Sequence, residues 1–300
     1  MTGKEMKKFV KQIDKFELST LEKGKIGGDF VSLKCGVTHY EIKGDGETVV
    51  LVHGYATPYY IYDKLFDEFV KRGYKTLRYD LLGRGFSERP KRDYTPELFA
   101  EQLDELTNAV IPNEKFILVG TSMGGSICAT FTVEHPEKVK KLALLAPAGM
   151  DTFKPPFYMK LCKVKGLGEL VFYSVAGKLL LKKCASEMYY STEKEKDYYV
   201  RKFAEAAKFK GFLRSTLSSL RNTILQTKKV TENYKTIGKT DIPILCIWGT
   251  IDKTMPYYQS ARLTEVCKNA KLITYENSGH IFLFDEGERC AKDLLDFFVE

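Results

Sequence analysis

The chain has 300 residues, of which 44% are hydrophobic, 13% aromatic and 29% charged. This composition is typical of a globular protein and excludes an intrinsically disordered chain. The length accommodates one large α/β domain or two smaller ones. No uninterrupted apolar run reaches about 18 residues, so the sequence predicts no transmembrane helix. The polar, lysine-rich N-terminus has neither the apolar stretch nor the cleavage site of a secretory signal.

The seven cysteines are widely scattered and include no Cys-x-x-Cys pair. A zinc cluster or a disulfide framework requires closer spacing. The cysteines therefore indicate a reducing compartment. Together with the missing signal and transmembrane segments, they predict a cytoplasmic protein, with peripheral membrane contact left open.

The net charge of +8 is unevenly distributed. Residues 151–240 hold 19 of the 47 Lys and Arg residues but only 8 of the 39 Asp and Glu residues. Because the lysines alternate with glutamates and follow no nucleic-acid-binding motif, we expect no nucleic-acid partner. A solvated basic face remains open, as does attraction of an anionic substrate or membrane surface.

The first elements are a polar extension and a hairpin. Residues 1–28 include an apolar spacing around Phe9 and Ile13 that fits a short amphipathic helix. The sequence does not decide whether this extension docks on the protein, lies on a membrane or stays loose. Two short runs at 30–35 and 37–42 predict a β-hairpin.

Strands and helices alternate after the hairpin. We expect strands at 48–53, 75–80, 115–121 and 141–145, and helices at 58–71, 95–110 and 123–135. Thr95 is expected to be an N-cap, because Pro96 follows it at the first helical position. Such alternation predicts a mostly parallel sheet covered by helices on both faces.

The alternation is interrupted between residues 151 and 240, which lack strand periodicity. We expect helices there at 157–165, 167–183, 193–208 and 211–226. The alternation resumes with strands at 243–248 and 271–275 and helices at 257–269 and 284–299. The sequence thus predicts an α/β core (residues 29–150 and 241–300), a helical cap (151–240) and an N-terminal extension (1–28).

The strongest chemical motif is Gly120-Thr121-Ser122-Met123-Gly124, which matches G-x-S-x-G. An apolar strand precedes it and a helix follows it. A strand that turns sharply into a helix places the middle residue in a strained conformation, and the flanking glycines make room for the turn. We therefore predict that Ser122 is a nucleophile in a nucleophile elbow.

His280 is the expected base, since it follows the last strand and would emerge on the same sheet edge as Ser122. Asp252 follows the penultimate strand and is the expected carboxylate that orients His280. Asp151, after the strand at 141–145, is a competing acid. Asp285 is expected to cap the final helix.

Two backbone N–H groups are expected to form an oxyanion hole. The N–H of Met123 would lie at a helix N-terminus, where it points at developing negative charge. The N–H of Tyr55 would face the same pocket, because Gly54 lets the loop after the strand at 48–53 turn close to the substrate. We expect His53 and Arg84 to have structural roles in these loops.

Five motifs in order along residues 29–300 resemble the α/β-hydrolase superfamily, in its cap-bearing serine esterase and lipase branch. They are His53-Gly54, Asp80-x-x-Gly83-x-Gly85-x-Ser87, Gly120-x-Ser122-x-Gly124-Gly125, Trp248-Gly249-x-x-Asp252 and Ser278-Gly279-His280. The resemblance implies the triad Ser122, Asp252 and His280, a helical lid over the active site, and no metal or organic cofactor. The serine nucleophile departs from the dehalogenases and epoxide hydrolases of this fold, which use aspartate. The loop after His53 lacks the H-G-G-P-G pattern of proline iminopeptidases.

These features predict a serine hydrolase that cleaves carboxylic esters with an apolar acyl chain, such as a monoacylglycerol. Seven tyrosines and six phenylalanines between residues 151 and 240 fit an apolar substrate pocket, although they also fit ordinary packing of a lid. One alternative is a carbon–carbon bond hydrolase of ring-cleavage-type diketones, which uses the same triad. Another is a small-molecule receptor on a hydrolase scaffold.

Overall fold

The computed structural model describes residues 3–22, 24 and 26–300. In this part of the chain, eight strands form one sheet in the order β1-β2-β4-β3-β5-β6-β7-β8. The strands are β1 (Asp29–Leu33), β2 (Gly36–Lys43), β3 (Thr48–Val52), β4 (Lys75–Tyr79), β5 (Phe116–Thr121), β6 (Val139–Leu145), β7 (Ile244–Gly249) and β8 (Ala270–Tyr275). The hairpin strands β1 and β2 are antiparallel to their neighbours, and the other six are parallel.

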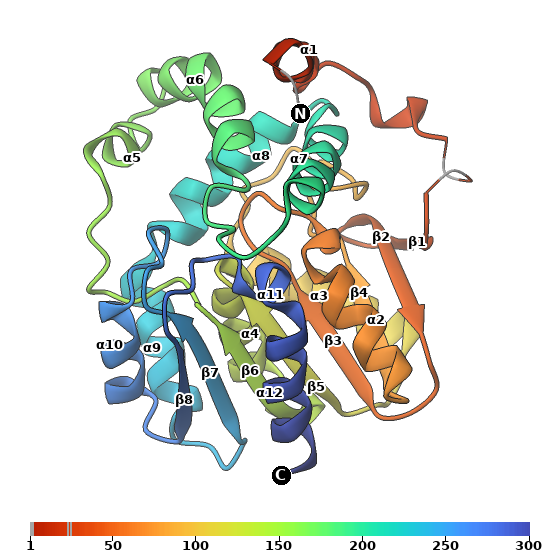
Figure 1. The fold of residues 1–300 in the computed structure, drawn as a ribbon, viewed down its shortest axis with the longest axis vertical. Coiled ribbons are helices and arrows are strands. Elements are labelled where there is room, and N and C mark those ends of the chain that lie inside the picture. The colour runs from red at the N-terminus through yellow and green to blue at the C-terminus, as the bar shows by residue number, and fades with distance from the viewer. Residues whose placement is uncertain (1–2, 23, 25) are drawn as a thin grey trace.

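Helices cover both faces of the sheet, as its fully buried central strands require. On one face, α2 (Asp63–Lys71) packs against α12 (Gly287–Val299). On the other face, α3, α4, α9 and α10 form a continuous layer (Figure 1). The bounds of these four helices are Pro96–Val110, Met123–Glu134, Thr227–Ile237 and Tyr258–Val266. This architecture confirms the predicted α/β-hydrolase fold class.

Four helices form a separate group above the sheet, and we refer to them as the cap helices (Figure 1). They are α5 (Phe157–Leu161), α6 (Leu167–Lys183), α7 (Glu193–Ala207) and α8 (Phe212–Ser219). The helix expected at 211–226 ends earlier as α8 and continues into a π-helical turn at Leu220–Ile224. The helix α9 was not expected, and it lies against α4 and α10 in the layer beside the sheet.

The N-terminal extension docks on the cap helices. Its helix α1 (Gly3–Gln12) is followed by Ile13, whose buried side chain packs against Gly177 of α6. The backbone of Lys15 and Phe16 then binds the carbonyl of Lys208, after the end of α7. The extension therefore runs from the cap helices to the edge strand β1 and connects the two parts of the molecule.

No helix in the described ranges is both long enough and apolar enough to cross a lipid bilayer.

Candidate active site

Ser122 occupies the sharp turn between β5 and α4, with backbone angles φ 53° and ψ −121°. Positive φ is costly for a residue with a side chain and concentrates at functional sites. The glycines two positions away make the turn possible. A Cβ at Gly124 would lie 2.1 Å from the carbonyl oxygen of Val52, and one at Gly120 would lie 2.5 Å from the Cys128 sulfur. The G-x-S-x-G pattern therefore folds as the sequence predicts.

The surrounding backbone fixes this turn. The N–H of Ser122 donates to the carbonyl of Leu145 at the end of β6. The Ser122 carbonyl accepts from the N–H groups of Gly125 and Ala148. Only 7% of Ser122 is exposed.

His280 and Asp252 are brought together from the loops after β8 and β7. The Nδ1 of His280 donates to a carboxylate oxygen of Asp252 over 2.7 Å. The second carboxylate oxygen of Asp252 accepts from the backbone N–H groups of Thr254 and Met255. The carboxylate is thus held by three donors, which fixes the orientation of the imidazole ring. Among the described residues, no bond to the Nε2 of His280 is recorded.

The neighbouring carboxylates raise the pKa of the His280 ring. Burial lowers the pKa of this imidazole, but the Asp252 carboxylate and the nearby Glu187 raise it, and the net pKa lies above its ordinary value. Burial raises the pKa of the Asp252 carboxyl, although the His280 ring favours its ionised form. The two groups interact directly, so they titrate as a pair.

The loop after β3 lies directly against Ser122. A Cβ at Gly54 would be 3.2 Å from the Ser122 Cβ. Within the described chain, the backbone N–H groups of Tyr55 and Met123 donate no hydrogen bond. Their role as an oxyanion hole stays a prediction.

His53 and Arg84 hold this loop in place. The Nε2 of His53 accepts from the N–H of Leu81, so its Nδ1 carries the proton and donates to the carbonyl of Gly54. Burial lowers the pKa of His53 to about 4, which keeps the ring neutral. The buried Arg84 guanidinium donates to the carbonyl of Tyr55 and to the Ser215 and Ser219 hydroxyls of α8. The predicted structural roles of His53 and Arg84 agree with these contacts.

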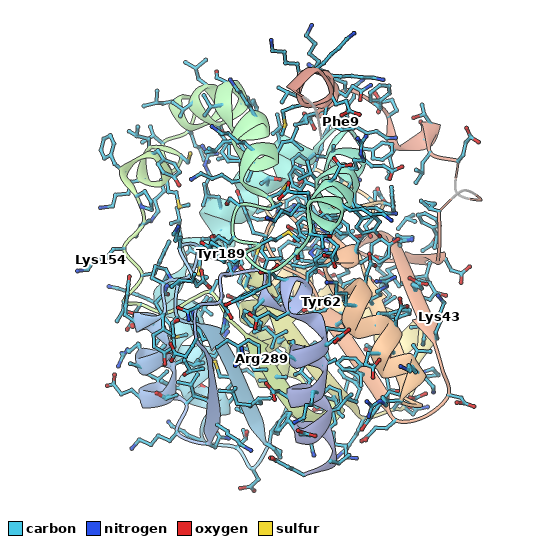
Figure 2. All side chains as sticks on the ribbon, viewed as in Figure 1. Phe9, Lys43, Tyr62, Lys154, Tyr189 and Arg289 are labelled. Atoms are coloured by element: carbon cyan, nitrogen blue, oxygen red, sulfur yellow. The ribbon has the colours of Figure 1, made fainter. Side chains whose placement is uncertain are left out.

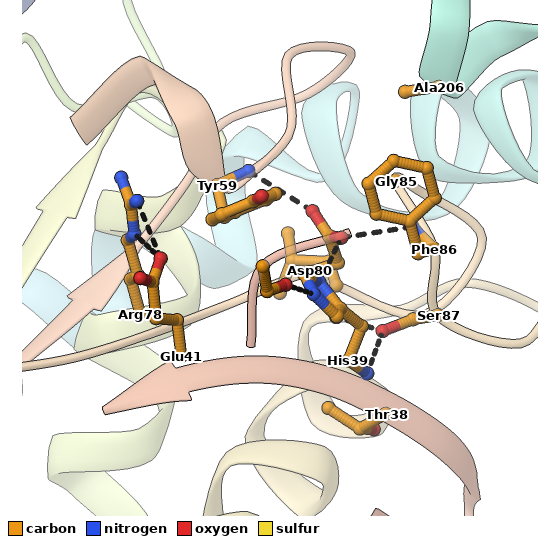
Figure 3. Close-up of polar contacts among 12 residues, drawn as sticks. Thr38, His39, Glu41, Tyr59, Arg78, Asp80, Gly85, Phe86, Ser87 and Ala206 are labelled. Atoms are coloured by element: carbon orange, nitrogen blue, oxygen red, sulfur yellow. Dashed lines mark hydrogen bonds and ion pairs between the residues drawn. The ribbon is translucent and has the colours of Figure 1, made fainter. Parts of the chain in front are cut away.

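Asp80 anchors the turn that buttresses the loop (Figure 3). Its carboxylate accepts from His39 Nδ1 and from the backbone N–H groups of Tyr59 and Phe86. Gly85 is required here, because it has φ 50° and its Cβ would overlap the Asp80 carboxylate at about 2.0 Å.

Two other acidic residues considered in the sequence analysis, Asp151 and Asp285, do not bind His280. Asp151, the competing acid, is exposed and forms an ion pair with Arg262. The prediction that Asp285 caps the final helix is wrong. Its side chain points the other way and accepts from the backbone N–H groups of Tyr189, Tyr190 and Ser191, in the connection between α6 and α7. That connection carries no local signal of this contact, which depends on long-range packing.

Two further features complete the site. The structure records no hydrogen bond between the Ser122 hydroxyl and His280 in the part of the chain that it describes, and such bonds are often loose without substrate. Glu187 of the α6–α7 connection contacts the His280 and Asp252 loops and was not recognised from the sequence.

In the described ranges, no group of three or more His, Cys, Asp or Glu side chains is placed to hold a metal ion.

The sheet order and the serine at a strained strand-to-helix turn define an α/β-hydrolase-fold serine hydrolase. Residues 45–287 match the model of the Hydrolase_4 family, described as serine aminopeptidase, S33. Because this match spans most of the chain, the protein belongs to that family and is an enzyme.

Known relatives span several activities. The chain is 26% identical to Lipase 3 from Moraxella sp., covering 84% of this chain and 77% of the relative. It is 28% identical to the 2-hydroxy-6-oxononadienedioate/2-hydroxy-6-oxononatrienedioate hydrolase of Klebsiella pneumoniae, covering 87% and 90%. Among solved structures, an esterase from Exiguobacterium antarcticum superposes with a TM-score of 0.76 at 21% identity, covering 91% of this chain and all of that one. These relatives show that the protein is an esterase or another hydrolase of this fold. They do not define its substrate.

Proposed function

We propose that this protein hydrolyses carboxylic esters with an apolar acyl chain through an acyl-enzyme on Ser122. The observation that carries the proposal is the strained Ser122 turn on the same sheet edge as the hydrogen-bonded pair of His280 and Asp252. Nucleophile, base and orienting acid thus come from three loops that follow parallel strands.

In the acylation step, Nε2 of His280 takes the proton of the Ser122 hydroxyl as its oxygen attacks the ester carbonyl. Asp252 holds the proton-bearing Nδ1 and stabilises the imidazolium. The backbone N–H groups of Tyr55 and Met123 donate to the oxyanion of the tetrahedral intermediate. His280 then gives its proton to the departing alkoxide, and the alcohol leaves.

In the deacylation step, water attacks the acyl-enzyme while His280 takes one of its protons. The second tetrahedral intermediate collapses when His280 returns that proton to the Ser122 oxygen. The carboxylic acid is released, and the serine hydroxyl is restored. No proton or electron pair is left over, so the cycle needs no cofactor.

Aromatic side chains near the site support an apolar acyl group. The Tyr189 ring packs against Gly279, next to His280, and lies where the cap helices meet the core (Figure 2). The Tyr55 hydroxyl donates to the carbonyl of Thr216 in α8, so this ring fills the space between loop and cap. Aromatic side chains next to catalytic loops are compatible with an apolar ligand.

The test is hydrolysis of p-nitrophenyl esters from acetate to palmitate by the wild type and by Ser122→Ala. We expect Ser122→Ala to lower kcat by about 10⁶-fold, because the variant cannot form the acyl-enzyme. Rates should rise with medium or long acyl chains. A fluorophosphonate should label the wild type only. Hydrolysis that persists in Ser122→Ala would falsify the proposed mechanism.

Carbon–carbon bond hydrolysis is a second candidate, favoured by the 28% identity to the Klebsiella pneumoniae hydrolase named above. The two candidates differ in substrate, so a 2-hydroxy-6-oxo dienoate is assayed in parallel. Turnover of this diketone without ester hydrolysis selects the second candidate. Labelling of Ser122 without turnover of either substrate indicates a receptor on a hydrolase scaffold.

A further inference from the structure

A single carboxylate from the α6–α7 connection (residues 184–192) reaches both loops that carry the base and the acid. Glu187 is only 6% exposed. One of its carboxylate oxygens accepts from the N–H of Lys253 over 2.8 Å and from the N–H of His280 over 3.2 Å. The other accepts from the Thr254 hydroxyl over 2.5 Å.

These contacts bracket the reactive pair. Lys253 and Thr254 directly follow Asp252, whose carboxylate binds the His280 ring. Glu187 therefore holds the backbone behind the acid and the backbone behind the base at the same time. A shift of either loop would lengthen the bond between His280 and Asp252.

The position of Glu187 is itself fixed by the core. Asp285 accepts three consecutive N–H groups of residues 189–191, only two residues further along the connection. Gly279 lies in such close contact that a Cβ there would be 2.6 Å from the Glu187 carbonyl oxygen. Figure 1 shows this connection reaching down from the cap helices toward α11 (Phe282–Asp285).

We propose that Glu187 is a positioning residue, by which the cap aligns His280 and Asp252 for catalysis. This inference rests on the proposed function, because it assigns a role toward the same reaction. Glu187 touches no reacting atom. Its carboxylate acts through geometry, by holding two loops, and through charge, by stabilising the imidazolium that forms when Ser122 is deprotonated.

The other charged groups around His280 are already engaged. Asp252 binds the ring directly. Lys253 extends over the Tyr189 ring. Asp285 is occupied by backbone N–H groups, and Glu286 accepts the hydroxyl of Ser278. The effect of Glu187 on the imidazole therefore adds to that of Asp252, and both carboxylates raise the pKa of His280.

The experiment compares Glu187→Gln, Glu187→Ala and the control Glu169→Gln. The amide of Glu187→Gln can still accept the two N–H groups and donate to Thr254, so it removes the charge and keeps the contacts. Glu187→Ala removes both. Glu169 belongs to the cap helix α6 and pairs with Arg221, away from the site, so its substitution removes the same charge elsewhere.

Two measurements separate the role of the Glu187 charge from the role of its hydrogen bonds. The first is the titration of the His280 imidazole by NMR, which needs no turnover and involves only four histidines. The second is the pH profile of ester hydrolysis, whose acidic limb reports the same group. We expect Glu187→Gln to move the His280 titration and the acidic limb of the pH profile to lower pH. The neutral imidazole is favoured once the Glu187 charge is gone. We expect Glu187→Ala to lose about 10²-fold in kcat with little change in KM, because small misplacements of catalytic groups have effects of that size.

The His280 imidazole should titrate at the same pH in the control Glu169→Gln and in the wild type. The inference is overturned if Glu187→Gln leaves the His280 titration unchanged, or if a folded Glu187→Ala variant keeps the wild-type kcat. The proposed function fails separately, when the wild type shows no Ser122-dependent hydrolysis. In that case a lowered His280 titration in Glu187→Gln still supports the action of the Glu187 charge on the imidazole.

Discussion

At the residue scale, the acid of the candidate triad is held by several hydrogen bonds. Asp252 is buried, and its carboxylate accepts from the His280 ring and from two backbone N–H groups of its own loop. A carboxylate oxygen can only accept, so it selects the imidazole tautomer with the proton on Nδ1. An amide at this position could present its NH₂ group instead and reverse the tautomer.

We therefore expect Asp252→Asn to lower kcat by about 10⁴-fold while the protein stays folded. Asp151→Asn is the matched control, because Asp151 was the competing acid and lies in an exposed ion pair with Arg262. Exposed pairs of this kind contribute about 0–1 kcal/mol to stability and nothing to the tautomer. The measurement is ester hydrolysis by both purified variants. A large loss in Asp151→Asn with an active Asp252→Asn would reverse the assignment of the acid.

At the element scale, His39 joins three segments of the chain. It lies on β2, its Nδ1 contacts Asp80 after β4 over 2.8 Å, and its Nε2 contacts the carbonyl of Gly27 in the N-terminal extension over 2.8 Å. Both partners accept, so both ring nitrogens must donate and the ring is a buried imidazolium. Burial lowers the pKa of His39, but Asp80 and Gly27 raise it to a net value above the ordinary one.

The pair of His39 and Asp80 makes the free energy of unfolding depend on pH. A raised folded-state pKa contributes stability that is fully present below the unfolded pKa of about 6.5 and is lost as pH rises through the folded-state pKa. We expect His39→Gln to lower the free energy of unfolding by about 3 kcal/mol at pH 6, since it leaves the Asp80 charge buried without its partner. The difference from the wild type should shrink toward pH 9. Urea unfolding of both proteins across this range is the measurement, and a difference that does not change with pH would exclude an imidazolium at His39.

The elements that could be predicted from the sequence are those with local signals. The apolar runs of β3, β5 and β7 and the Thr95 cap of α3 appear where they were expected. The helix α9 was missed because its buried residues Val230, Tyr234 and Ile237 are few and lie among lysines and threonines. Their partners, Gly125 and Gly149, come from distant parts of the chain.

The residues of the candidate site also differ in whether the sequence could predict them. Ser122, His280 and Asp252 each follow a recognisable strand, so their common sheet edge could be predicted from the strand order alone. Glu187 lies in a connection without periodicity, and its contacts arise only when the cap helices dock on the core. The roles of Glu187 and Asp285 therefore needed the three-dimensional structure.

At the scale of the whole molecule, the segment that holds α5 and α6 combines basic charge with exposed apolar side chains. Residues 153–183 contain seven lysines and one acidic residue, Glu169, which pairs with Arg221. Large apolar side chains are exposed beside these lysines, with Phe157 74% and Leu170 68% exposed. Lys154, in the segment before α5, extends away from the body of the protein (Figure 2). Basic charge and exposed apolar side chains within one surface segment are typical of contact with an anionic lipid surface.

We therefore expect the wild type to sediment with vesicles that contain phosphatidylglycerol and much less with phosphatidylcholine alone, and expect added salt to weaken the binding. Phe157→Ser combined with Leu170→Ser should lower the partition coefficient by about 10²-fold or more, because each buried apolar side chain contributes about 1.5–3 kcal/mol. Val299→Ser is the matched control, since Val299 is 78% exposed at the end of α12, at the opposite end of the molecule from the cap helices (Figure 1). The double variant should keep wild-type hydrolysis of a short, water-soluble ester, which separates surface binding from catalysis. Equal sedimentation with both kinds of vesicle, or loss of binding in Val299→Ser as well, would show that this segment does not contact an anionic lipid surface.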